Sequence, residues 1–158
     1  MAMVELTLIG VRVELPANQP IVLLKERKGD RYLPIWIGAF EATAIAFALQ
    51  GIETARPMTH DLMKNILDEL GITMKEVVIS DLREGTFYAD INLVYEGKPF
   101  KIDARPSDAI ALAVRTGVSI YSDEHVLNEA SVFIQTDEEE EIERFRDFLK
   151  DVKPEDFF

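Results

Sequence analysis

The sequence predicts an α+β fold, a single domain in which helices pack on a mixed, largely antiparallel sheet. Apolar, β-branched runs recur along the chain between Gly, Pro, Asn and Asp residues, which is typical of strands joined by turns. Helical patterns interrupt these runs without the regular alternation of a parallel sheet. No linker-like segment divides the 158 residues, and this length suits one domain with a substantial core.

The first third of the chain predicts three strands, at residues 4–15, 21–27 and 31–38. Pro16 and Asn18 supply the turn of a hairpin between the first two strands. Pro34 indicates that the third strand lies at an edge or carries a bulge, because proline has no N–H to donate. Trp36 is expected in the core.

Two helices of different character follow. Residues 41–50 are apolar nearly all round and rich in alanine, so this helix should be buried against the sheet or a second subunit. Residues 59–70 predict a surface helix, because apolar and charged residues occupy opposite sides of it. Its apolar stripe consists of Leu62, Met63, Ile66, Leu67 and Leu70.

The second half predicts a meander of three strands followed by a helix that ends at Gly117. The strands are expected at residues 75–82, 85–97 and 98–104. A short strand at 118–121, a helical turn at 122–130 and a last strand at 131–135 should complete a domain of residues 1–135. Residues 136–158 then predict an acidic C-terminal helix packed on that domain.

The composition limits the classes of function. The absence of cysteine excludes disulfides, thiolate metal sites and cysteine nucleophiles, and it fits a reducing cytoplasm. No apolar stretch approaches the roughly 20 residues that span a bilayer. The first residues carry no export signal, so we expect a cytoplasmic protein without a membrane partner.

The formal net charge of −12 argues against nonspecific coating of nucleic acid, which depends on Lys and Arg neutralising phosphates. A local arginine cluster or a bound divalent cation can nevertheless reverse the field within one cleft. The overall charge therefore does not exclude a nuclease.

One polar motif occurs twice. Residues 55–62, "ARPMTHDL", and residues 104–110, "ARPSDAI", both run from Ala-Arg-Pro through a hydroxyl residue and an acid into an apolar helix. Proline keeps the residue before it extended, and Thr59 and Ser107 are then expected to cap the two helices. In a purely structural interpretation, Arg56 and Arg105 pair with nearby carboxylates such as Asp103 or Glu41.

The functional interpretation of the doubled motif is phosphoryl-transfer chemistry. Carboxylates hold Mg²⁺ or Mn²⁺, arginines clamp phosphate, and a histidine near neutral pKa can orient water. This hypothesis assigns catalysis to His60, Asp61 and Asp108, substrate binding to Arg56, Thr59, Arg105 and Ser107, and a metal ion to Asp61, Asp103 and Asp108. No role is assigned to His125.

Four segments in order, "LPIWIGAFEATAIAFALQG", "ARPMTHDL", "GTFYADI" and "DARPSDAIALAVRTG", resemble the bifunctional nuclease family from about Val4 to Gln135. The resemblance implies an α+β fold with a mixed sheet, a homodimer, and nuclease activity on RNA and DNA. By position, the polar motif residues of the family are Glu41, Arg56, Thr59, His60, Asp61, Asp103, Arg105, Ser107 and Asp108.

Two alternatives to a nuclease remain at this point. In one, the chain is a noncatalytic homodimeric binding or regulatory module, and the Ala-Arg-Pro loops are structural. In the other, the helix N-termini bind a nucleotide or a phosphorylated metabolite, although the acids at those termini disfavour an anion. The nuclease hypothesis requires the two loops to meet at one cleft, within a subunit or between two.

Overall fold

Eight strands of the described chain form one sheet in the order β6-β5-β4-β7-β1-β2-β3-β8. The computed structural model describes residues 2–14 and 19–134. The strands are β1 (Met3–Glu14), β2 (Gln19–Glu26), β3 (Arg31–Trp36), β4 (Thr73–Arg83), β5 (Thr86–Tyr95), β6 (Lys98–Ala104), β7 (Ile120–Asp123) and β8 (Val132–Phe133). The helices described are α1 (Ala39–Leu49), α2 (Thr59–Glu69), α3 (Pro106–Thr116) and α4 (Glu124–Ala130).

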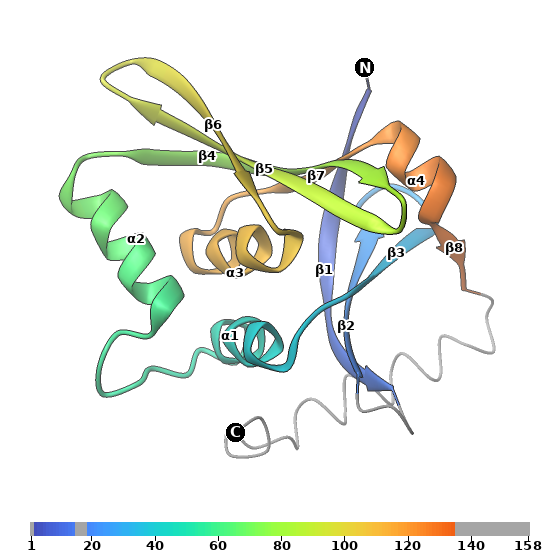
Figure 1. The fold of residues 1–158 in the computed structure, drawn as a ribbon, viewed down its shortest axis with the longest axis horizontal. Coiled ribbons are helices and arrows are strands. Elements are labelled where there is room, and N and C mark those ends of the chain that lie inside the picture. Colours follow the sequence, from blue (N-terminus) through green and yellow to red (C-terminus); the bar gives the residue numbers. More distant parts are fainter. Residues whose placement is uncertain (1, 15–18, 135–158) are drawn as a thin grey trace.

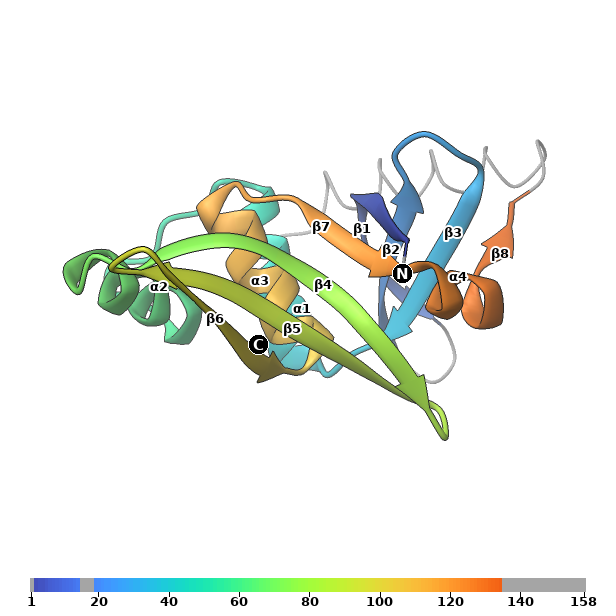
Figure 2. The ribbon, with the colours of Figure 1, turned by 90° about the horizontal axis from the view of Figure 1, so that it is seen from above.

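The pairing confirms the predicted fold class. Neighbouring strands are antiparallel except for β4 and β7, which are parallel. Figure 1 shows a strongly twisted sheet, with α3 beneath β4 and β5 and with α1 beyond α3. Seen from above, α3 crosses behind the long β4–β5 ribbon, while α4 lies beside β3 and β8 (Figure 2). The three helices α1, α2 and α3 therefore share one side of the β4–β6 half of the sheet.

The strands of the first hairpin form as expected, and Pro34 lies at an exposed edge. Strand β8 pairs only with Arg31 and Tyr32, so it does not reach Pro34. The prediction that Trp36 is a core residue is wrong, because its side chain is 55% exposed. Successive side chains of a strand alternate between its two faces, and Ile35 and Ile37 take the buried face.

The core lies between the sheet and the alanine-rich helices. All residues of α1 from Ala42 to Phe47 are buried, which confirms that this helix is internal. In α3, residues 109–113 are buried as well, and the two helices pack against each other. Small alanine side chains on both helices allow their backbones to approach closely. Helix α1 also contacts β1 and β2, so it packs on the sheet as well as on α3.

Helix α2 lies at the surface as predicted, but most of its apolar stripe faces outward. Only Leu67 packs against the core, and His60 is the buried residue of the helix. The other members of the stripe are exposed: Leu62, Met63, Ile66 and Leu70. Helix α2 thus contacts the body through His60 in its first turn and through Leu67 nearer its end.

The remaining elements follow the expected order with small shifts of boundary. The short strand and helical turn are β7 at Ile120–Asp123 and α4 at Glu124–Ala130, and the last strand is reduced to Val132–Phe133. The helix expected at 136–158 lies outside the described residues.

Candidate functional site

The two Ala-Arg-Pro loops lead into α2 and α3, whose first turns lie side by side. Nε2 of His60, in α2, is 2.9 Å from Oδ1 of Asp108, in α3. The His60 side chain is 9% exposed and the Asp108 side chain is 30% exposed. The structure therefore brings together two predicted site residues that are 48 positions apart in the chain.

The expected caps differ in detail. The helices begin one or two residues earlier than the hydroxyl residues require, with Met58 and Arg105 at the N-cap positions and no cap bond from either side chain. Pro106 starts α3 because the fixed φ of proline and its missing N–H suit the first helical position. The prediction that Thr59 and Ser107 cap the helices is therefore wrong.

Asp61 forms hydrogen bonds both at the start of α2 and to α3. Its Oδ2 accepts the Met58 backbone N–H at 3.0 Å, and its Oδ1 accepts from Nε of Arg115 at 2.8 Å. Partial burial alone would raise the pKa of Asp61, but the hydrogen bonds from Arg115 and Met58 hold it below its ordinary value. Asp61 is thus a charged anchor between the two helices.

Arg105 links the first turn of α3 to α1. Its Nη2 lies 3.0 Å from Oε1 of Glu41 and 3.3 Å from Oδ2 of Asp108. The negative charge of Asp108 and the hydrogen bond to Glu41 raise the pKa of the guanidinium, which stays charged. Because the Arg105 side chain is 66% exposed, part of the guanidinium remains open to a ligand.

Asp103 does not join this cluster. It lies on β6 opposite Asp90 of β5, whereas the neighbouring pair Ile102 and Ile91 occupies the other face. Ile91 is buried in the core beneath the helices, so alternation along the strands places Asp103 on the face turned away from α2 and α3.

Arg56 is also separate from the cluster. It is exposed in the loop before α2, and in the described part of the chain its side chain forms no ion pair. Thr59 is exposed at the start of α2, while Ser107 is buried in α3. The loops therefore meet through His60, Asp61, Arg105 and Asp108.

The three predicted metal ligands do not form a prepared cation site. Across residues 2–14 and 19–134, no three His, Asp or Glu side chains are grouped so that they could hold a metal ion. One oxygen of Asp61 is bonded to Arg115, one oxygen of Asp108 to Arg105, and Asp103 faces the other side of the sheet. The donor set as arranged does not fit Mg²⁺ or Mn²⁺, which require several oxygens around one point.

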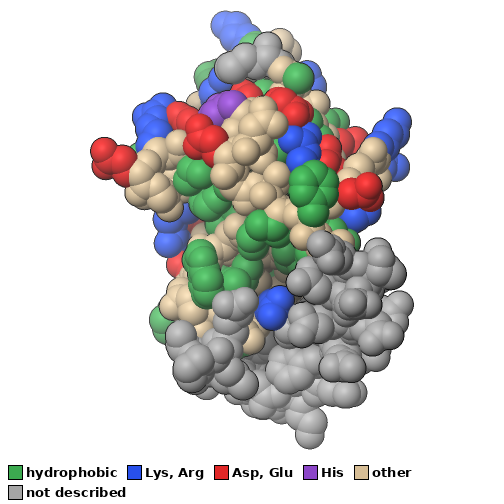
Figure 3. Space-filling model, turned by 90° about the vertical axis from the view of Figure 1, so that its right-hand side faces the viewer, with side chains coloured by type: hydrophobic (Ala, Val, Ile, Leu, Met, Phe, Trp, Pro, Cys, Tyr) green, Lys and Arg blue, Asp and Glu red, His purple; other side chains and the backbone are tan. Residues whose placement is uncertain are grey.

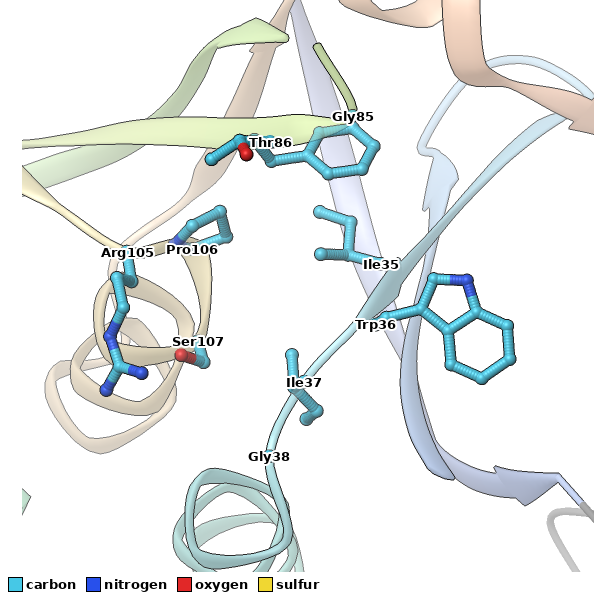
Figure 4. Close-up of a pocket in the computed structure, with 10 residues that line it drawn as sticks. Ile35, Trp36, Ile37, Gly38, Gly85, Thr86, Arg105, Pro106 and Ser107 are labelled. Atoms are coloured by element: carbon cyan, nitrogen blue, oxygen red, sulfur yellow. The ribbon is translucent and has the colours of Figure 1, made fainter. Parts of the chain in front are cut away.

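A cavity of about 310 Å³ opens beside the first residues of α3. It is lined by residues of β3, of the β4–β5 turn and of the α3 start: Ile35, Trp36, Ile37, Gly38, Gly85, Thr86, Phe87, Arg105, Pro106 and Ser107. Figure 4 shows Ile35 and Ile37 directed toward α3, whereas the Trp36 indole lies on the other side of β3. Arg105 belongs both to this cavity and to the cluster around Asp108.

A second histidine site was missed by the sequence analysis. Nδ1 of His125 lies 2.8 Å from Oδ1 of Asp123, and its Nε2 lies 3.0 Å from Oδ1 of Asp81. Both carboxylates raise the pKa of His125. The pair of Asp123 and His125 could be recognised in the sequence, because Asp123 caps a helix two residues before the histidine. The contact with Asp81 could not, because Asp81 comes from a distant strand.

The net charge of −12 gives no broad attraction for polyanions. On the face shown in Figure 3, acidic and basic side chains are interspersed around a hydrophobic centre. None of the described helices is long and apolar enough to cross a bilayer.

Comparison with known proteins gives the family. Residues 22–135 match the bifunctional nuclease domain. An uncharacterised protein of Mycobacterium tuberculosis (strain ATCC 25618 / H37Rv) is 51% identical over 162 aligned residues, covering 97% of each chain. Bifunctional nuclease 2 of Oryza sativa subsp. japonica is 30% identical over 70% of this chain and 35% of its own. Bifunctional nuclease 1 of Arabidopsis thaliana is 28% identical over 66% of this chain and 33% of its own.

The chain thus spans about a third of the length of these plant relatives. The matched residues include both Ala-Arg-Pro loops and the strands and helices that bring them together. The chain belongs to the bifunctional nuclease domain family.

Proposed function

We propose that this protein hydrolyses phosphodiester bonds of RNA or DNA at the contact between α2 and α3. The observation that carries the proposal is the 2.9 Å hydrogen bond between His60 Nε2 and Asp108 Oδ1, which joins the two copies of the polar motif. A histidine held by a carboxylate is a common arrangement for moving a proton at neutral pH. Relatives named as nucleases share the family, which favours nucleic acid as the substrate.

In this proposal, each polar group has a separate task. Asp108 orients the His60 ring by accepting a hydrogen bond from Nε2–H, and in this tautomer Nδ1 is the atom that takes a proton from the attacking water. Arg105 binds the phosphate with the exposed part of its guanidinium. Asp61, which is held by Arg115, positions the first turn of α2 and therefore the neighbouring His60.

Three further residues complete the proposed substrate contacts. Arg56 and Thr59 are exposed on the α2 side of the cluster, where they can bind the phosphate or sugar of an adjacent nucleotide. Ser107 lies on the α3 side and lines the cavity. The polar groups thus flank the histidine on both sides.

A requirement for Mg²⁺ or Mn²⁺ stays a prediction. An ion at Asp61 or Asp108 would compete with Arg115 and Arg105 for the same carboxylates. The proposed proton transfer and phosphate binding therefore assign no step to a metal, and the activity assay includes chelator and added ions as separate arms.

The substitution Asp108→Asn tests the proposal, because it removes the charge and keeps the shape. We expect cleavage of RNA and single-stranded DNA by purified protein to fall about 10²- to 10⁴-fold, the usual contribution of acid–base catalysis. Asp103→Asn is the matched control on the opposite face of the sheet and should retain activity. Undiminished cleavage by Asp108→Asn would contradict the proposal. Equal losses in both variants, together with loss in chelator, would instead favour the three-aspartate metal hypothesis.

The second candidate is a noncatalytic homodimeric binding module, and the ion pairs favour it. Arg105 joins α3 to α1 through Glu41, and Arg115 joins α3 to α2 through Asp61, so both arginines have a structural task. The net charge of −12 also disfavours binding to a polyanion. In this alternative, Arg105→Ala lowers the melting temperature, and the purified protein has no nuclease activity to lose.

We also propose that the protein acts in the cytoplasm as a homodimer. The absence of cysteine suits a reducing compartment. The exposed apolar side chains of α2 supply a surface through which two copies can associate.

A further inference from the structure

The cavity beside α3 has the size and lining of a small-molecule site. Its volume of about 310 Å³ lies at the lower end of the roughly 300–1,000 Å³ found for ligand pockets. Ile35 and Ile37 form one wall, and Pro106 with the start of α3 forms the facing wall (Figure 4). Phe87 and Thr86 close the side near the β4–β5 turn. The space is thus a slot between two apolar surfaces.

The slot also has polar groups at one side. Ser107 is only 5% exposed, and among the described residues its hydroxyl forms no hydrogen bond to protein, while its oxygen stays in contact with solvent. A ligand that displaces water from this hydroxyl can replace the hydrogen bond that water makes there. Arg105 adds exposed N–H donors, and the Glu41 carboxylate lies over Gly38, which lines the slot.

The charges around the slot disfavour a free anion inside it. Arg105 is balanced by Glu41 and Asp108, so the local charge is not positive. The matching ligand is therefore flat and uncharged, with apolar faces and an edge that can both donate and accept hydrogen bonds. A nucleobase has these properties, and stacking contacts of bases with protein side chains contribute to binding single strands.

We propose that this slot binds one unpaired nucleobase of a single-stranded substrate, next to the phosphate held at the slot mouth by Arg105. This inference rests on the proposed nuclease function and deepens it by naming the form of the substrate. A base engaged in a duplex presents neither face and cannot enter the slot, so the enzyme selects single strands or flips a nucleotide out.

The test is a titration of the ¹⁵N-labelled protein with nucleotides that cannot be cleaved. Adenosine monophosphate, uridine monophosphate and ribose 5-phosphate are added at millimolar concentrations, and backbone amide shifts are followed by NMR. We expect base-dependent shifts at Ile37, Thr86 and Ser107 with the two nucleotides. Ribose 5-phosphate should leave these amides unchanged. Equal shifts with ribose 5-phosphate, or no shift at these residues with either nucleotide, would overturn the proposal.

Three variants keep the test specific. Thr86→Phe fills the slot from an exposed strand position and should weaken nucleotide binding by roughly tenfold or more. Thr73→Phe makes the same change at an exposed position of β4 outside the slot and should bind as the wild type does. Ser107→Ala should cost several-fold in affinity, because the base loses one hydrogen bond.

This experiment separates the two proposals. Base-dependent binding together with full cleavage by Asp108→Asn would keep the slot and overturn the proposed catalytic pair. Cleavage that depends on Asp108 without base-dependent shifts would keep the catalytic pair and overturn the slot.

Discussion

At the residue scale, the cluster depends on carboxylates that each serve two partners. Asp108 accepts from His60 and Arg105, and Asp61 accepts from Arg115 and the Met58 backbone. Sequence reasoning identified these acids from the doubled motif, but it did not identify Arg115, which lies seven positions beyond Asp108 in the same helix. The only signal for Arg115 in the sequence was its helical spacing from Asp108. Nothing near Arg115 in the sequence indicates that Asp61 is its partner.

Replacing Arg115 by Met tests the anchor between α2 and α3. Its side chain is 8% exposed and donates to Asp61 and to the Ala111 carbonyl at 3.0 Å. The variant leaves Asp61 without its charged partner, so the free energy of unfolding measured in urea should fall by about 1–3 kcal/mol. Lys64→Met breaks an exposed pair with Asp68 and should cost less than about 0.5 kcal/mol. Equal effects of the two substitutions would show that the Arg115 pair is not an anchor.

The His125 cluster predicts a dependence of stability on pH. The neighbouring carboxylates raise the pKa of His125 above its ordinary 6.5, so its contribution is complete below 6.5 and is lost as the pH rises through the folded value. The hydrogen bonds from His125 and Arg83 lower the pKa of Asp81 to about 2. The contribution of Asp81 is therefore present above its ordinary 3.8 and is lost as the pH falls toward 2.

Melting temperatures measured between about pH 5 and 9 check this behaviour. On going to the alkaline end, the wild type should lose more stability than His125→Asn, which lacks the titrating group. Because His60 is present in both proteins, the difference between the two curves isolates His125. Parallel curves would contradict the role given to the Asp81 and Asp123 contacts.

At the element scale, periodicity predicted the strands and helices well, because each pattern is local. The hairpin of β1 and β2, the meander of β4 to β6 and the three longer helices form where the apolar spacing indicates. What the patterns did not determine is the register between strands. Pairing of Asp103 with Asp90 decides that Asp103 faces away from the helices, and this pairing depends on the whole β5–β6 hairpin.

Helix α2 shows a second limit of periodicity. Its stripe predicts an apolar face, but the pattern does not say whether that face packs on the same subunit. In the structure Ile66 is 49% exposed and Leu62 is 52% exposed. The helix is held through His60, Asp61 and Leu67, and the rest of the stripe is left available for association.

The substitution Ile66→Glu tests whether this stripe joins two copies. A carboxylate in an apolar interface is strongly disfavoured, so the variant should be monomeric where the wild type is dimeric, measured by size-exclusion chromatography with light scattering. Asn65→Glu adds the same charge at a neighbouring exposed position and should leave the assembly intact. A dimer that survives Ile66→Glu would place the interface elsewhere.

At the scale of the whole molecule, the fold converts a repeated motif into one site. The segments containing His60 and Asp108 are far apart in sequence, and α1, α2 and α3 bring them together on one side of the sheet (Figure 1). The doubled motif predicted that polar groups gather at helix starts. It did not distinguish a histidine–carboxylate pair from three aspartates around an ion, because that choice depends on side-chain partners from several elements.

The proposed site also explains how an acidic protein can act on nucleic acid. With a net charge of −12, the protein gains little from long-range attraction, so recognition must come from local contacts. In the proposed site, Arg105 at the mouth of the apolar slot would supply such contacts for one nucleotide. The chain thus suits weak, local engagement of single strands better than tight wrapping of a duplex.

The two histidines of the chain allow a direct comparison of a proposed catalytic group with a structural one. Cleavage of a single-stranded oligonucleotide is measured for the purified wild type, His60→Gln and His125→Gln. Each histidine is bonded to aspartate, but only His60 lies at the junction of the two motifs. The account predicts a loss of about 10²-fold or more in His60→Gln and near-normal activity in His125→Gln. Full activity in His60→Gln would contradict it.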